Sequence, residues 1–87
     1  MNLYTTIKVW KRLNDSSAVC YRCLKSLESG RYHVQSADFY HLPIDLTKLA
    51  RMDAQFIELF IEGTLSERGG EFSTLQEAIA AHEENFR

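Results

Sequence analysis

The chain has little of what marks secreted or membrane proteins. Its 87 residues include one proline and two cysteines, too few cysteines for the disulfide framework of a small secreted domain. No uncharged stretch approaches the roughly 20 apolar residues that a membrane-spanning helix needs. The first residues lack the basic segment and apolar run of a signal peptide. We therefore expect a soluble, cytoplasmic protein.

The sequence also lacks the motifs G-x-S-x-G, G-x-x-x-x-G-K-S/T, G-x-G-x-x-G and H-E-x-x-H, which mark common nucleophilic, phosphate-binding and metalloprotease sites. The nearest candidates are Asp38 with His41 and the carboxylate pair Glu58 and Glu62. No nucleophile accompanies the first pair, and the second is predicted to be solvated. We predict no catalytic residues, no cofactor and no enzyme; a small enzyme with a cleft at Asp38, His41 or Glu58 is the least favoured alternative.

Cys20 and Cys23 form the one C-x-x-C motif, a spacing typical of zinc sites and redox dithiols. On an extended strand, residues three apart point to opposite faces and cannot converge on one ion. His33 and His41 would complete only an irregular ligand pattern. We predict no metal site, with Cys23 a small core residue.

A real core is indicated by the 45% hydrophobic content and the ten aromatic residues. A chain of this length is expected to form a single domain, residues 1–87. Its charge is unevenly distributed. Residues 1–37 hold Lys8, Lys11, Arg12, Arg22, Lys25 and Arg31 against Asp15 and Glu28, a net charge of about +4, and residues 38–87 carry about −6.

Alternating apolar and polar residues predict strands over 5–13, 18–27 and 31–40, joined by turns at 14–17 and 28–30. Such short turns favour an antiparallel meander. One face is then expected to lie against helices: Ile7, Val9, Val19, Tyr21, Cys23, Tyr32 and Val34. This pairing needs an odd-length first turn, whereas a turn of two or four residues would place Trp10 beside Tyr21; the sequence leaves both open.

Pro43 is predicted to end the third strand, and Asp45 to cap a helix through Met52. Residues 55–61 fit a buried strand, which we favour, or a continuation of that helix, which would bury Asp53. Thr74 and Glu77 form a capping box for a last helix, with an apolar stripe that includes Phe86. The fold class is α+β, a two-layer sandwich with two helices on one face of the sheet, in the order β-β-β-α-β-α or alternatively β-β-β-α-α.

The opposite sheet face carries a basic, aromatic-bearing set of residues, and these are the predicted partner-binding site: Lys8, Trp10, Arg12, Arg22 and His33. Tryptophan flanked by arginine has the composition of an interface hot spot. We predict a small binding module for a protein partner or a second copy of the chain. Weak single-stranded nucleic-acid binding by the same face is the alternative. The sequence itself gives neither the partner nor the oligomeric state.

Overall fold

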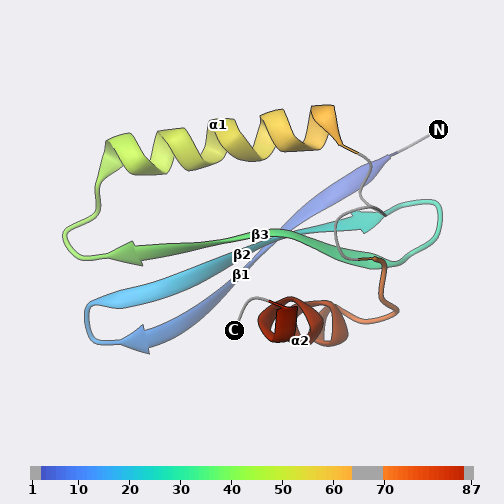
Figure 1. The fold of residues 1–87 in the computed structure, drawn as a ribbon, viewed down its shortest axis with the longest axis horizontal. Coiled ribbons are helices and arrows are strands. Elements are labelled where there is room, and N and C mark those ends of the chain that lie inside the picture. Colours follow the sequence, from blue (N-terminus) through green and yellow to red (C-terminus); the bar gives the residue numbers. More distant parts are fainter. Residues whose placement is uncertain (1–2, 64–69, 86–87) are drawn as a thin grey trace.

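The computed structural model describes residues 3–63 and 70–85, which form three strands followed by two helices (Figure 1). The strands are β1 (Tyr4–Asn14), β2 (Ser17–Ser26) and β3 (Tyr32–His41), and the helices are α1 (Leu46–Glu62) and α2 (Leu75–Asn85). The strands make one antiparallel sheet in the order β1-β2-β3. The predicted α+β class and the antiparallel meander are thereby confirmed. The order of elements is the alternative that we gave, β-β-β-α-α.

The register of the first hairpin places Val9 opposite Tyr21 and Trp10 opposite Cys20. An irregularity between Arg12 and Asn14 adds one residue to β1 beside the turn, which gives the odd-length connection that this pairing requires. The Asn14 side chain accepts a hydrogen bond from the Ser16 amide at 2.9 Å, and such local bonds are typical of asparagine in turns. The apolar strand residues therefore share one face.

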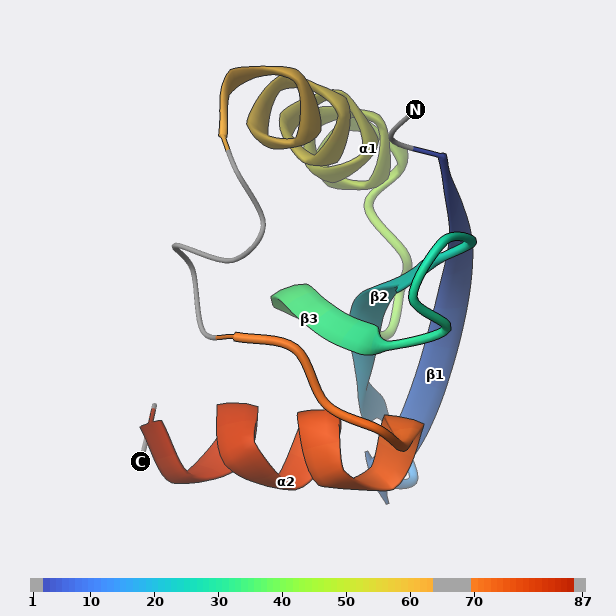
Figure 2. The same cartoon turned by 90° about the vertical axis from the view of Figure 1, so that its right-hand side faces the viewer.

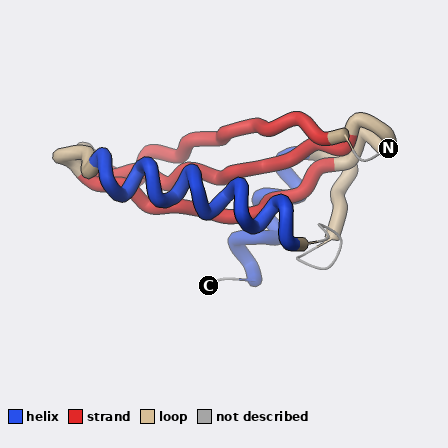
Figure 3. The backbone as a smooth tube through the Cα atoms, turned by 90° about the horizontal axis from the view of Figure 1, so that it is seen from above, coloured by secondary structure: helices blue, strands red, loops and turns tan. Residues whose placement is uncertain are grey.

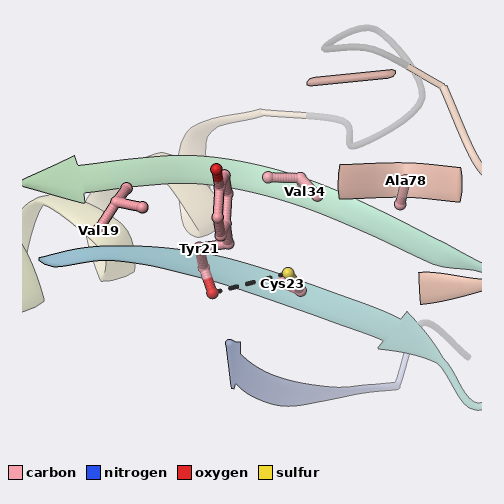
Figure 4. Close-up of a cluster of buried hydrophobic side chains, with 5 residues drawn as sticks. All are labelled: Val19, Tyr21, Cys23, Val34 and Ala78. Atoms are coloured by element: carbon pink, nitrogen blue, oxygen red, sulfur yellow. Dashed lines mark hydrogen bonds between the residues drawn. The ribbon is translucent and has the colours of Figure 1, made fainter. Parts of the chain in front are cut away.

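That face forms the core together with α2. Five buried side chains make its centre, shown in Figure 4: Val19, Tyr21, Cys23, Val34 and Ala78. Half-buried residues of β1 and α2, including Ile7, Val9 and Ile79, pack around them. All seven residues of the predicted inward set belong to this core, so that prediction is confirmed. Packing them together removes a continuous apolar surface from water.

The two helices lie on opposite faces of the sheet, and our prediction that both cover one face is wrong. Figure 2 shows the sheet between α1 and α2, and Figure 3 shows α1 lying lengthwise over the strands. Neighbouring residues of β2 face the two helices: Tyr21 Oη donates to Glu83 of α2, and Arg22 pairs with Asp53 of α1. Successive strand residues point to opposite faces, so the face predicted to be open is in part covered.

Residues 55–61 belong to α1, so the favoured strand is wrong and the helical alternative is confirmed. The Asp45 side chain caps the helix by accepting from the Thr47 and Lys48 amides at 2.9 and 3.1 Å, as predicted. Asp53 does face the sheet, but Arg22 offsets the cost of placing a carboxylate there. This cation comes from β2, which is distant from Asp53 in the sequence.

The last helix begins as its capping box predicts, with the Glu77 amide donating to Thr74 Oγ1 at 3.1 Å. The Glu77 carboxylate, however, accepts from the Ser73 hydroxyl at 3.2 Å. Phe86, the last residue of the predicted apolar stripe, lies outside the described residues. Among the helices of the described residues, none is long and apolar enough to cross a membrane.

Candidate binding surface

Arg22 lies under α1 at the centre of a polar network. Its side chain is 5% exposed, and Nε donates to Asp38 Oδ2 at 2.7 Å. Nη2 donates to Tyr40 Oη at 3.1 Å, and Nη1 lies 2.8 Å from Asp53 Oδ1. Burial acts to lower the pKa of Arg22, but the bonds to Tyr40, Asp38 and Asp53 outweigh it and raise the pKa. The guanidinium is therefore permanently charged, and each of its three nitrogens has a polar partner.

His33 is also buried, at 3% exposure. Its Nδ1 lies 2.9 Å from the Gly70 carbonyl oxygen, and its Nε2 has no hydrogen-bond partner among the described residues. Neither His33 nor Arg22 is accessible to a partner. The predicted surface is corrected accordingly: Arg22 leaves it because α1 lies over it, and His33 leaves it because it is buried and in contact with Gly70.

Lys8, Trp10 and Arg12 remain at the surface, where they line a groove that we call the Trp10 groove. The groove has a volume of about 720 Å³ and lies between the β1–β2 turn and the start of α1. Its other walls include Asn14, Asp15, Tyr40, Leu42, Ile44 and Leu49. Trp10 is 56% exposed, and its ring lies 5.8 Å from that of Tyr40 at an angle of 48°.

The apolar part of the groove is open to solvent. Leu42 is 62% exposed and Ile44 48%, and both lie with Trp10 in one concave surface. Single exposed apolar residues are normal on any protein, but a contiguous concave set marks an interaction site. The groove therefore has the composition of a hot spot: an aromatic anchor with an apolar wall.

Two of the residues that line the groove, Lys8 and Arg12, are cations. Among the described residues, the ion pairs involve Lys11 and Arg22, and not Lys8 or Arg12. Lys11 points to the other face of the sheet, 3.6 Å from Glu83. Asp15 is the carboxylate among the groove's lining residues. The two cations thus favour an anionic partner, at a strength that salt will reduce.

A second hollow continues along β1 on the same side. It has a volume of about 310 Å³ and lies between β1 and the middle of α1, where Asp53, Phe56 and Ile57 form its helical wall. Lys8 lines both this hollow and the Trp10 groove. Ile57 is 56% exposed. A ligand running along β1 would therefore meet apolar depressions on both sides of Lys8.

The cysteines are free thiols, and both are buried. Cys23 belongs to the core beneath α2, whereas Cys20 pairs with Trp10 and Asp38 across the strands, and the two side chains point to opposite faces. Burial, followed by the neighbouring Cys20, raises the pKa of Cys23 to about 11. No cluster of three or more potential metal ligands occurs within the described ranges.

Sequence reasoning missed the apolar wall of the groove. Leu42 and Ile44 flank Pro43 outside any strand or helix, so no periodic pattern assigned them to a face. Their signal was the presence of large apolar residues in a connecting segment, where polar residues are usual. Comparison of the chain with protein-family models, with curated proteins and with solved structures finds no match.

Proposed function

We propose that the protein is a non-catalytic binding module that holds a partner protein in the Trp10 groove. The observation that carries the proposal is Trp10 itself, 56% exposed in a concave apolar surface with Lys8 and Arg12 in its lining. A large indole left half in water loses hydrophobic stabilisation that a partner would restore. Aromatic anchors surrounded by polar rims are the usual core of protein interfaces.

The chemistry of the groove describes the partner. An apolar side chain would pack on Trp10, Leu42 and Ile44, while carboxylates beside it would meet Lys8 and Arg12. The apolar contact supplies most of the affinity, and the charges mainly raise the association rate and exclude cationic partners.

Nucleic-acid binding stays a prediction, with less support than before. The burial of Arg22 and His33 leaves Lys8 and Arg12 as the cations of the groove. Affinity for single strands falls with salt in proportion to the phosphates neutralised, so two cations give a weak, shallow dependence.

The test is partner recovery by three baits in parallel: the native chain, Trp10→Ala and Phe39→Ala. Phe39 is a matched control, because it is 54% exposed and lies outside the groove lining, in a hollow beside α2. We expect proteins recovered by the native chain and Phe39→Ala to be lost with Trp10→Ala. Truncating a hot-spot aromatic costs about 2 kcal/mol or more of binding.

Urea unfolding of the three proteins checks that Trp10→Ala stays folded. Recovery of the same proteins by all three baits would count against the groove. A gel shift of random single-stranded RNA and DNA that Trp10→Ala abolishes would favour nucleic acid instead.

A further inference from the structure

The outer side of β1 is an unpaired sheet edge. Within the described residues β1 pairs only with β2. The Leu27 amide donates to the Leu3 carbonyl at 2.9 Å, which shows that the residue just before β1 bonds toward β2. Inward-bonding and outward-bonding residues alternate along an antiparallel strand. Counting from Leu3, the residues whose backbone N–H and C=O groups point away from β2 are Tyr4, Thr6, Lys8, Trp10 and Arg12.

Three of these residues, Lys8, Trp10 and Arg12, also line the Trp10 groove with their side chains. Lys8 and Trp10 lie opposite Arg22 and Cys20, on the sheet face that α1 partly covers. Free backbone groups and binding side chains therefore belong to one set of residues, and both hollows lie beside them. A strand added to an open edge gains main-chain hydrogen bonds, and its alternate side chains enter pockets along that edge.

We infer that the partner segment binds as an extended strand added antiparallel to the outer edge of β1, with the pattern acidic-x-apolar-x-acidic. The inference rests on the proposed function. Each residue of an added strand lies on the same face of the sheet as the residue directly opposite it, so every second residue faces the groove. The acidic residues lie opposite Arg12 and Lys8, the apolar residue lies opposite Trp10, and the intervening side chains point to the α2 side.

Charge selects this occupant over a second copy of the chain. β1 contains Lys8, Lys11 and Arg12 and no acidic residue. Two copies paired through β1 would bring these cations close together, and like charges across a strand pair are destabilising. Lysine on an exposed edge is a common protection against wrong pairing, and carboxylates at the matching positions turn this repulsion into attraction.

The first experiment uses a labelled synthetic peptide of about seven residues, with glutamate second and sixth, leucine fourth and threonine elsewhere. Binding is measured by fluorescence anisotropy against the native chain, Trp10→Ala and Phe39→Ala. We expect Trp10→Ala to bind about 30-fold more weakly and Phe39→Ala to bind as the native chain does. The same peptide with lysine in place of glutamate should not bind. Equal binding of the two peptides, or binding of neither, would overturn the inference.

The second experiment tests the backbone bonds, using peptides that are N-methylated at alternating positions. A peptide residue that lies opposite an outward-bonding residue of β1 points its own N–H toward the edge of β1. Methylation of the leucine and glutamate amides should therefore abolish binding, whereas methylation of the threonine amides should leave it unchanged. Amide exchange of Lys8 and Trp10 should slow when the unmodified peptide is added.

The outcomes separate this inference from the proposed function. If the peptide binds through Trp10 but all of the N-methylated peptides bind equally well, strand addition is overturned and the groove remains a binding site. Slow exchange of the Lys8 and Trp10 amides without peptide, with a dimer in light scattering, would identify a second copy as the occupant and overturn the acidic peptide. Recovery of the same partner proteins by Trp10→Ala and by the native chain would overturn the proposed function itself.

Discussion

Replacing Arg22 with alanine is expected to remove a large part of the free energy of unfolding. The side chain is 5% exposed, and its main partner, Asp38, is 14% exposed. Truncation would leave the Asp38 carboxylate in a poorly solvated place without its cation. Breaking a buried ion pair by removing one partner costs about 3–5 kcal/mol, and small domains have only about 5–15 kcal/mol to lose. The variant should be largely unfolded in moderate urea.

The two carboxylates are expected to contribute unequally. Asp53 is 50% exposed, and solvent-screened pairs contribute about 0–1 kcal/mol. Asp38 is mostly buried, and hydrogen bonds to charged groups contribute about 1.5–3 kcal/mol. Asp38→Asn should therefore lower the free energy of unfolding more than Asp53→Asn. In Arg22→Lys the charge is kept but the planar fork is lost, so its stability should lie between that of Arg22→Ala and that of the native chain.

Urea unfolding followed by far-ultraviolet circular dichroism measures these differences. A loss below about 1 kcal/mol for Arg22→Ala would refute the reasoning, since it would mean that the Asp38 carboxylate is well solvated without its partner. A larger loss for Asp53→Asn than for Asp38→Asn would show that docking of α1, and not burial, sets the energetics of the network.

Further predictions concern the α2 face. Burial, followed by the charge of His33, lowers the pKa of His82 below its ordinary value of 6.5. As the pH falls, the unfolded chain therefore binds a proton at His82 before the folded chain does. The free energy of unfolding should be at its full value above about pH 6.5 and should fall as the pH drops below it. The urea midpoint of His82→Gln should change less over this range. Tyr21→Phe removes the bond to Glu83 and should cost about 1 kcal/mol in urea unfolding; a gain in stability would contradict the bond. Because burial raises the pKa of Cys20 and Cys23, both thiols should react slowly with a disulfide reagent until urea is added, and rapid native labelling would contradict their burial.

The parts of the fold that could be predicted from the sequence are those set by interactions between residues close in the chain. Alternation over the strands, the turn at Asn14 and the caps at Asp45 and Thr74 each involve residues close in sequence, and such signals need no knowledge of tertiary contacts. The strand bounds accordingly lie within one residue of their predicted positions at each end.

Two of the errors have a common cause in one long-range pair. Asp53 on an apolar helical stripe argued against a helix through 55–61, because a lone buried carboxylate is costly. Its partner Arg22 lies on β2, and Arg22 was assigned to an open surface because its own partners were also unknown. Neither residue could be placed correctly from the sequence, because the position of each is explained by its contact with the other.

The β1 side of the Trp10 groove could be predicted from the sequence, but the opposite wall could not. The exposure of Trp10 and its neighbours on β1 follows from strand alternation, so Lys8, Trp10 and Arg12 were found. The opposite wall comes from the segment after Pro43 and from Leu49 of α1, whose position depends on where α1 docks. Sequence periodicity says which side of a helix is apolar, but not which face of the sheet the helix covers.

The network around Arg22 connects stability to the proposed binding surface. No residue of α1 is buried, although the structure describes the helix along its whole length. Polar contacts attach it to the sheet, among them Arg22 with Asp53 and the Gln35 side chain donating to the Phe56 carbonyl at 2.9 Å, beside an edge-to-face ring contact of Tyr4 with Phe60 at 5.7 Å. A helix held this way is expected to open locally more easily than the α2 core unfolds. Because α1 carries Leu49 and Ile57, walls of the two hollows beside β1, loss of the Arg22–Asp53 pair should disturb partner binding before it unfolds the sheet.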